Sequence, residues 1–300
     1  SLQSIRSTLV PERGVKPEMI GGIFPRGGVS ILAGQQGSGK SLLMQKFCSD
    51  VSLGGEILSG VSLNEAPRKI VYFVGELPVD TMNDRQRTTA WGFDPKMLVL
   101  YSRIEASKNE IALDLTDAEG FKNIAAIIRE ENPDLVAFDS LMSFATIDES
   151  DMKAMQSVFS KLVRLAGEEK IAVVLIHHIR KRKGVERQGR LHMDDVIGSS
   201  IITRNASVAV GVESVKQDDG TESVHVTNLK SWYAPLDEFA FSIVRDDFKV
   251  LRGIEVELDP ESPSANKAEA IKQAVFKGHA DGSAFSVAGI ASLTGATDRY

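Results

Sequence analysis

Gly34-Gln35-Gln36-Gly37-Ser38-Gly39-Lys40-Ser41 is the stretch that decides the fold of this chain. It matches the pattern G-x-x-x-x-G-K-[ST] of a phosphate-binding loop, in which glycines let backbone N–H groups turn toward phosphate oxygens. Lys40 would reach the β- and γ-phosphates, and the Ser41 hydroxyl would take one position on Mg²⁺. The loop therefore predicts ATP and Mg²⁺ as cofactors, bound by Gly34, Gln35, Gln36, Gly37, Ser38, Gly39, Lys40, Ser41 and Leu42.

The flanks of the loop strengthen this prediction. An apolar run, Val29–Ala33, precedes the loop and predicts a buried strand. Leu43 and Phe47 follow it at the spacing of one helix face, and Cys48 beside them is expected in the core. A strand, a glycine loop and a helix in this order place a helix N-terminus under the phosphates. A glycine-rich turn with a lysine nearby is the weaker alternative.

Composition is that of an ordinary globular protein. The chain has 300 residues, 42% of them hydrophobic and 25% charged, and a net charge of −6. This charge argues against a uniformly basic nucleic-acid protein but permits a local basic strip. The single cysteine cannot form an internal disulfide, and no apolar run reaches the ~20 residues of a membrane helix. We therefore expect no membrane partner and a reducing, cytoplasmic setting.

Apolar, strand-like runs alternate with helical patterns over the first two thirds of the chain. This alternation predicts an α/β fold with a mainly parallel central sheet and helices on both faces. The expected strands are 29–33, 70–75, 97–101, 135–138 and 171–176. Shorter runs at 206–213, 223–229, 238–245 and 248–254 predict an antiparallel extension of the same sheet.

Two apolar stripes between these strands predict helices that face the core. The first contains Phe121, Ile124, Ile127 and Ile128, after a capping box formed by Thr116 and Glu119. The second contains Met152, Met155, Phe159, Leu162 and Leu165.

The predicted domain organisation is one ATPase domain over residues 1–258, a linker over 259–265 and a helical segment over 266–300. The run 286–297 is similar to the first helix and turn of a helix-turn-helix. A truncated winged-helix module and a helical cap fit this segment about equally well.

Acidic side chains end two of the expected strands. Asp139 follows the apolar run 135–138, at the strand end where ligands bind in open α/β sheets, and is the candidate second Mg²⁺ residue, acting through water. Ser140 could bond a water of that metal. Because Ser140 stands where a catalytic acid could follow, the base must come from elsewhere, and Glu76 ends another strand at the same edge. Arg85 could contact a phosphate or pair with an acid, although an ordinary surface role is its default.

A third strand ends in His177 and His178, and a basic segment follows. We expect His178 to sense the γ-phosphate, and His177 is the weaker candidate. Residues 179–190 contain six cations and one acid, a local charge of +5 that suits nucleic-acid phosphates. The candidate nucleic-acid residues are Arg180, Lys181, Arg182, Lys183, Arg187 and Arg190. A solvated loop or a subunit contact is the alternative.

Together these motifs resemble RecA-type P-loop ATPases, and in particular the RepA-like branch of hexameric replicative helicases from plasmids and phages. The resemblance covers 17–252 and is specific only in combination. It rests on Gly34–Ser41, Glu76-Leu77-Pro78, Arg85, Asp139-Ser140, His177-His178, Lys181, Gly198-Ser199-Ser200 and Leu229-Lys230-Ser231-Trp232-Tyr233-Ala234-Pro235. It implies a RecA-like core and a ring-forming homo-oligomer, with a hexamer as the expected number. It also implies single-stranded DNA and replication proteins as partners.

In such enzymes a cation from a neighbouring subunit completes the site, and it can raise turnover by several orders of magnitude. Lys230 and Arg204 are the candidates here, counted with Lys40 and Glu76 as catalytic residues. Ser207 stands where the RepA-like finger arginine is expected, and Arg204 lies three residues earlier. This departure puts the assignment of the finger in question.

Three functions fit the motifs. The first is an ATP-driven oligomeric motor on single-stranded DNA, as in a helicase or replication ATPase. The second is an ATP-regulated DNA-binding switch, and the third is a KaiC-like signalling ATPase. Stimulation by nucleic acid separates the first from the third, and preference for single strands or duplex separates the first from the second.

Overall fold

The computed structural model describes residues 17–58, 61–78, 80–81, 92–147, 151–179, 191–196, 200–216, 222–233, 239–244 and 247–251. Contacts within the chain separate it into two units, Ser1–Arg252 and Gly253–Tyr300. All of the described residues lie in the first unit. The predicted linker and helical segment at 259–300 lie outside the described residues, so they stay predictions.

Within the described part of the chain, a nine-stranded sheet has the order β13-β12-β11-β10-β3-β9-β8-β6-β7. The strand at the phosphate loop, β3 (Val29–Gly34), lies between β10 and β9. The other strands are β6 (Ile70–Val74), β7 (Leu98–Ser102), β8 (Leu135–Asp139), β9 (Ala172–His178), β10 (Val208–Lys216), β11 (Glu222–Ser231), β12 (Phe239–Val244) and β13 (Asp247–Leu251).

The sheet has a parallel and an antiparallel part. The strands from β10 through β3, β9, β8 and β6 to β7 pair in parallel. The strands β10, β11, β12 and β13 pair antiparallel. The predicted fold class is therefore confirmed, with strand bounds that differ from the expected ones by a few residues.

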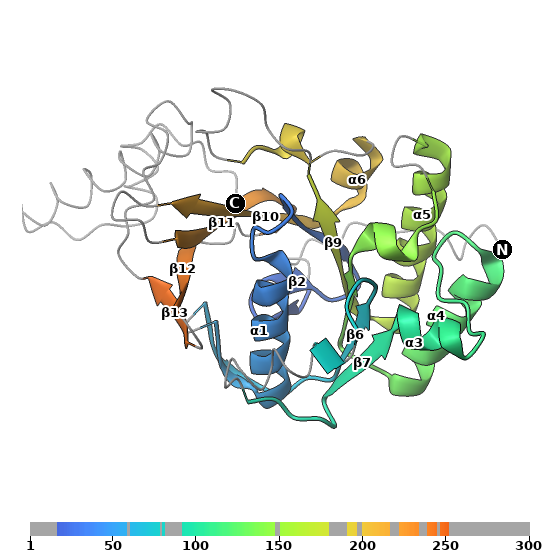
Figure 1. Cartoon of the computed structure of the whole chain (residues 1–300), viewed down its shortest axis with the longest axis horizontal. Helices are drawn as coiled ribbons and strands as arrows, with labels where there is room; N and C mark the ends of the chain where they lie inside the picture. The colour runs from blue at the N-terminus through green and yellow to red at the C-terminus, as the bar shows by residue number, and fades with distance from the viewer. Residues whose placement is uncertain are drawn as a thin grey trace, which may run out of the picture. The chain divides into compact units, whose positions relative to one another are not determined.

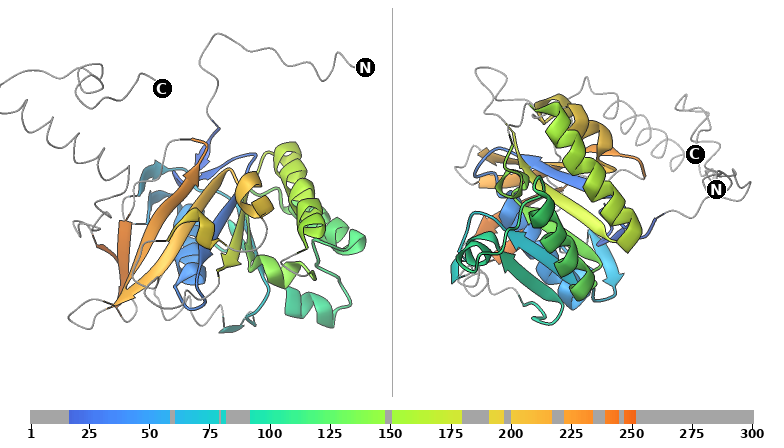
Figure 2. Two further views of the ribbon diagram at one scale, coloured as in Figure 1. Left: turned by 90° about the horizontal axis from the view of Figure 1, so that it is seen from above. Right: turned by 90° about the vertical axis from the view of Figure 1, so that its right-hand side faces the viewer.

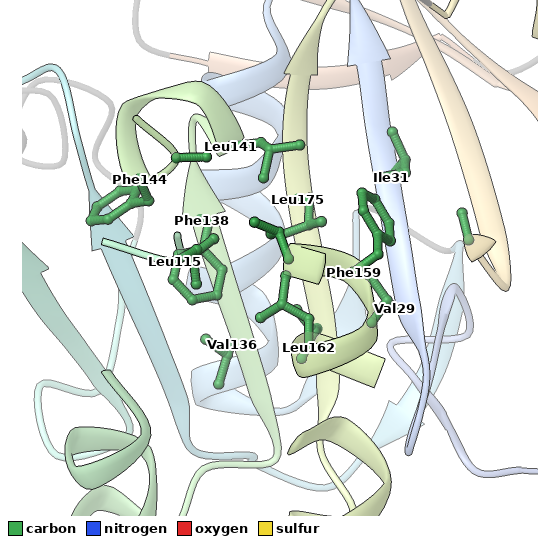
Figure 3. Packing of buried hydrophobic residues seen from close by; sticks show 14 of the residues in the cluster. Val29, Ile31, Leu115, Val136, Phe138, Leu141, Phe144, Phe159, Leu162 and Leu175 are labelled. Carbon is green, nitrogen blue, oxygen red and sulfur yellow. The ribbon is translucent and has the colours of Figure 1, made fainter. Parts of the chain in front are cut away.

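Helices cover both faces of the parallel part (Figures 1 and 2). On one face, α4 (Ala118–Glu131) and α5 (Met152–Glu169) pack against β-strand residues that include Val136, Phe138 and Leu175. Figure 3 shows this layer with Phe159 and Leu162 among the strand side chains. The other face packs against α1 (Lys40–Leu53) through residues such as Leu32 and Ala137. Because side chains alternate along a strand, each parallel strand contributes side chains to both packed layers.

Smaller elements complete the described residues. The hairpins β1 (Met19–Ile20) with β2 (Phe24–Pro25), and β4 (Gly55–Ile57) with β5 (Ser62–Glu65), lie outside the main sheet. Two short helices, α3 (Arg103–Lys108) and α6 (Ser200–Asn205), and two 3-10 turns, η2 (Leu141–Phe144) and η4 (Met193–Asp195), join the strands. Among the described helices, none combines the length and the apolar character that a membrane crossing needs.

Two details of the sequence predictions were wrong. The N-cap of α4 is Asp117, whose carboxylate accepts from Gly120 N, and not Thr116. The Thr116 hydroxyl is used elsewhere, because it donates to Asp114 Oδ1. Met152 was expected in the core but its side chain is 53% exposed, because it is the first residue of α5 and lies beyond the layer that the rest of its stripe joins.

Charged residues are collected at the amino ends of the parallel strands, which we call the amino edge. Arg26 precedes β3 and pairs with Glu18 (Nε–Oε2 2.9 Å) and with Asp134, the residue before β8. Arg68, two residues before β6, also pairs with Glu18 and lies 3.8 Å from Asp134. The second oxygen of Asp134 accepts from Lys69 N at 3.0 Å. The charges of these residues thus neutralise one another.

Candidate nucleotide site

The candidate site lies at the other end of the parallel strands from the amino edge, where four adjacent strands reach their carboxyl ends. We call this the carboxyl edge. There β3 ends in the phosphate loop, β6 leads into Glu76, β8 ends at Asp139 and β9 ends at His178. The sheet order β3-β9-β8-β6 brings these ends side by side. The structure therefore gathers at one edge the residues that the sequence placed at strand ends.

Local backbone geometry explains the glycines of the loop. Gly37 and Gly39 have φ of 79° and 88°, in the left-handed region that favours glycine. A Cβ on Gly34 would lie 2.2 Å from the carbonyl oxygen of Val212, so that a side chain there would force β3 and β10 apart. The helix α1 begins at Lys40, so its first N–H groups face the loop.

Lys40 is buried beneath this loop. Its Nζ donates to the carbonyl oxygens of Gly34 at 2.9 Å and Gln35 at 2.6 Å. Burial lowers the pKa of Lys40 to about 8, although Asp139 and Glu76 act to raise it. The backbone N–H of Ile179 also donates to Gly34 O at 3.1 Å, so this carbonyl joins the phosphate loop to the residue that precedes the basic segment.

Asp139 is held by hydroxyl groups. The Ser41 side chain hydrogen-bonds its carboxylate, and Tyr72 Oη donates to Oδ2 at 2.8 Å. Burial raises the pKa of Asp139, and these two hydrogen bonds act in the opposite direction. The carboxylate therefore stands beside the hydroxyl that the loop motif assigns to Mg²⁺.

Glu76 is also oriented by hydroxyls. Its Oε1 accepts from Ser140 Oγ at 3.0 Å and from Ser143 Oγ at 3.1 Å, and the two serines are 3.0 Å apart. Ser143 comes this close only because position 75 is glycine, where a Cβ would lie 2.2 Å from Ser143 Cβ. The Glu76 side chain is 58% exposed, so it faces the open side of the edge.

The two histidines at the end of β9 lie on opposite faces of the sheet. His177 is fully buried. His178 turns toward the α1 side, with Nε2 at 3.8 Å from Glu76 Oε1. The alternation of side chains along a strand thus gives His178, and not His177, access to the carboxylate.

The residues present fit Mg²⁺ and a triphosphate. Serine and carboxylate oxygens are hard donors, and Mg²⁺ is typically held by one or two carboxylates together with substrate phosphates. Within the described ranges no three His, Cys, Asp or Glu side chains cluster as a metal cage. The Ser38 hydroxyl, inside the loop, is buried without a hydrogen-bond partner among the described residues. A phosphate oxygen would supply such a partner.

Lys230 and Arg204 lie away from this edge. Val224, near the start of β11, lies 3.4 Å from the position that a Cβ on Gly39 would take. Lys230 comes six residues later on the same strand, about 20 Å further at the usual rise per residue. Its Nζ donates to Arg204 O at 3.1 Å and lies 4.9 Å from the centre of the Trp232 ring, which is exposed. Neither cation is positioned to reach the phosphate loop of its own chain.

Other predicted residues fall outside the described residues, namely Arg85, the basic segment 180–190, and Gly198 and Ser199. Sequence reasoning missed Tyr72 and Ser143. Tyr72 sits in an apolar strand and reads as a core residue. Ser143 follows Asp139 by four positions, and that proximity is the only signal that could have suggested it.

Comparisons with known proteins identify the family and the fold of the chain. Residues 10–184 match the family described as AAA domain. A KaiC-like protein from Pyrococcus horikoshii OT3 superposes with a TM-score of 0.52 at 16% identity, covering 80% of this chain and 100% of that chain. The flagellar accessory protein FlaH from Methanocaldococcus jannaschii gives a TM-score of 0.50 at 14% identity, covering 76% and 91%. At this identity the likeness shows the shared RecA-like fold. No curated protein sequence matches the chain.

Proposed function

Because the chain belongs to the AAA domain family, we propose that it binds Mg·ATP at the carboxyl edge and hydrolyses the γ-phosphate. One observation supports the proposal most directly. Adjacent strand ends bring together the phosphate loop, the hydrogen-bonded pair Ser41 and Asp139, and the Glu76 carboxylate that Ser140 orients. Phosphoryl transfer needs little covalent help from a protein and depends on positioning and charge. The edge provides both.

Each residue has a defined task in this proposal. The loop N–H groups and Lys40 bind the phosphates, and Ser41 together with Asp139 would hold Mg²⁺, the latter through water. When bound, Mg²⁺ neutralises charge on the phosphate oxygens. Glu76 orients a water for in-line attack and takes its proton, a role that requires hydrogen-bond reach. Ser140 and Ser143 fix the direction of the Glu76 carboxylate by donating to one of its oxygens.

His178 is proposed to sense the γ-phosphate. It lies beside Glu76 and is followed by Ile179, whose N–H is bonded to Gly34 O. A change at the phosphates is thus transmitted to the end of β9, from which the basic segment continues. This gives a physical route from hydrolysis to a change in binding by that segment.

We further propose a ring-forming homo-oligomer, with a hexamer as the expected number, in which Lys230 or Arg204 completes the site of a neighbouring subunit. The support is their distance from the phosphate loop of their own chain together with their surface position: Arg204 is exposed and Lys230 is partly exposed. A cation inserted from a neighbour would neutralise charge as the phosphoryl group transfers.

The nucleic-acid role rests on the basic segment 180–190. Its charge of +5 favours nucleic-acid phosphates through counterion release. The resemblance to RepA-like helicases adds single-stranded DNA and replication proteins as the partners of a cytoplasmic replication ATPase. The alternative is a KaiC-like or DNA-binding switch whose ATP state controls assembly. The similarity in fold to a KaiC-like protein and to FlaH supports this second candidate function.

Steady-state ATP hydrolysis tests these functions. Turnover should be measured without nucleic acid, with single-stranded DNA and with duplex DNA at matched salt. Strong stimulation by single strands supports the motor, and duplex binding with little stimulation supports the DNA-binding switch. Hydrolysis that responds to neither supports a KaiC-like switch acting on protein partners. If the protein does not hydrolyse ATP under any condition, the proposed activity is wrong.

A further inference from the structure

Tyr72 is a buried tyrosine whose hydroxyl contacts Asp139 at the candidate nucleotide site. It lies in the middle of β6, in the layer that faces α1, and its exposed fraction is 1%. The register pairs Val74 with Asp139, so Tyr72 is diagonally adjacent to Asp139 on the same face of the sheet. Its Oη donates to Asp139 Oδ2 at 2.8 Å. A core position would be filled equally well by phenylalanine, so the hydroxyl needs a separate explanation.

The Tyr72 hydroxyl also has a partner on α1. Gln45, which is 2% exposed, hydrogen-bonds the Tyr72 side chain. The helix that starts at the phosphate loop is therefore tied to Asp139 twice. The first connection is the hydrogen bond between Ser41 and Asp139. The second consists of the hydrogen bonds from Gln45 to Tyr72 and from Tyr72 to Asp139.

We propose that Tyr72 is a positioning residue for Mg²⁺: by holding the Asp139 carboxylate, it lets Ser41 donate its proton to Asp139 and keep its oxygen lone pairs for the metal. The inference rests on the proposed function, because it assumes that Ser41 and Asp139 serve Mg·ATP. A serine has one proton to donate, and a carboxylate fixed in the right place decides where that proton points. In this proposal Tyr72 acts through Asp139, which its hydroxyl contacts directly.

The chemistry of the site explains why this role falls to a tyrosine. A cation beside Asp139 would compensate its charge and weaken the attraction for the metal. A neutral donor orients the carboxylate and leaves that charge in place. Since Tyr72 is buried and bonded on both sides, its hydroxyl is held in one direction by the surrounding structure.

The test compares Tyr72→Phe with Tyr101→Phe. Tyr101 makes the same kind of hydrogen bond, donating to Glu131 Oε1 at 2.8 Å, on the neighbouring strand β7. For each protein the affinity for a fluorescent ATP analogue (mant-ATP) is measured in EDTA and in Mg²⁺. We expect Tyr72→Phe to lower the gain in affinity that Mg²⁺ provides by about tenfold, with the affinity in EDTA changed less than about twofold. Tyr101→Phe should leave both values unchanged.

A second variant and probe keep the inference falsifiable if Tyr72→Phe is unstable. Gln45→Leu removes the hydrogen bond between α1 and Tyr72 and should reduce the Mg²⁺ gain in the same direction. Electron paramagnetic resonance of Mn²⁺ added with the ATP analogue should show weaker Mn²⁺ binding in both variants. Equal loss of affinity with and without Mg²⁺, or an unchanged Mg²⁺ gain in both variants, would overturn the role of Tyr72. Failure of the wild-type protein to bind the analogue would instead overturn the proposed function.

Discussion

The two edges of the parallel sheet use charged residues in opposite ways. At the amino edge, Arg26, Arg68, Glu18 and Asp134 form a network in which cations face carboxylates. At the carboxyl edge, the partners of Asp139 and Glu76 are mostly hydroxyls. The loops at the two edges connect the same strands.

This difference separates stability from function. Ion pairs at the amino edge compensate one another, so little net charge remains there to attract a ligand. Hydroxyl donors at the carboxyl edge orient carboxylates without compensating their charge, and Lys40 donates to backbone carbonyls rather than to an acid. Substitutions at the carboxyl edge should therefore change activity, and substitutions at the amino edge should change stability.

The largest effect is expected from Lys40→Ala. Loss of its ammonium group removes charge-assisted hydrogen bonds to the phosphates. These bonds contribute about 3 kcal/mol or more to the binding free energy, which corresponds to a loss of over about a hundredfold in affinity. We expect no measurable hydrolysis and greatly weakened binding of mant-ATP, with the melting temperature measured in parallel. The control is Lys122→Ala on the exposed face of α4, which should retain ATP hydrolysis and mant-ATP binding. Wild-type binding by Lys40→Ala would place the nucleotide elsewhere.

Next in size is Glu76→Gln. The amide keeps an oxygen that can accept from Ser140 and Ser143, so the side chain should stay in place while its ability to take a proton is lost. We expect kcat to fall by about 10²–10⁴-fold with mant-ATP affinity unchanged. The exposed Glu168→Gln serves as the matched control. Hydrolysis at the wild-type rate would show that another residue is the base.

The amino edge should give a smaller effect of a different kind. Asp134→Asn removes the charge that faces Arg26 and Arg68, and we expect the free energy of unfolding to drop by about 1–3 kcal/mol. Since the residue is remote from the nucleotide, kcat and KM should change less than about twofold. Denaturant unfolding and steady-state kinetics check both values. Glu119→Gln, an exposed acid near Lys122, should change stability by less than about 0.5 kcal/mol. A catalytic loss in Asp134→Asn would break the division between the edges.

The smallest effect is expected from Ser143→Ala. Ser140 still donates to Glu76 in this variant, so only part of the orientation is lost. We expect kcat to fall by about three- to tenfold at unchanged KM, with recovery in Ser143→Thr, which keeps the hydroxyl. Ser160→Ala, on the exposed side of α5, controls for loss of a hydroxyl. If Ser143→Ala has the wild-type kcat, Ser140 alone orients the base.

Much of the architecture could be predicted from sequence because apolar runs and glycine chemistry are local signals. The phosphate loop and the runs around it identified β3 and α1. Acids after apolar runs placed Asp139 and Glu76 at one edge. Parallel strands share an edge for their carboxyl ends, so these residues could be grouped without knowing the strand order.

Other features depend on contacts between distant segments. Tyr72 becomes an Asp139 partner only through the register of β6 with β8, which no local pattern encodes. Thr116 and Asp117 are both good capping residues, and the contact of Thr116 with Asp114 decides between them. The spacing of Lys230 and Arg204 in sequence gave no sign that they lie far from the phosphate loop of their own chain.

The carbonyl of Gly34 has a thermodynamic consequence. It accepts from Lys40 Nζ and from Ile179 N, so one oxygen is shared by the lysine of the phosphate-loop motif and the residue before the basic segment. If a triphosphate draws Lys40 away, Ile179 becomes the main partner of that oxygen. Any factor by which ATP then changes the affinity of the basic segment for a polyanion must equal the factor by which the polyanion changes the affinity for ATP. The two ligands thus form a closed cycle whose four affinities cannot vary independently.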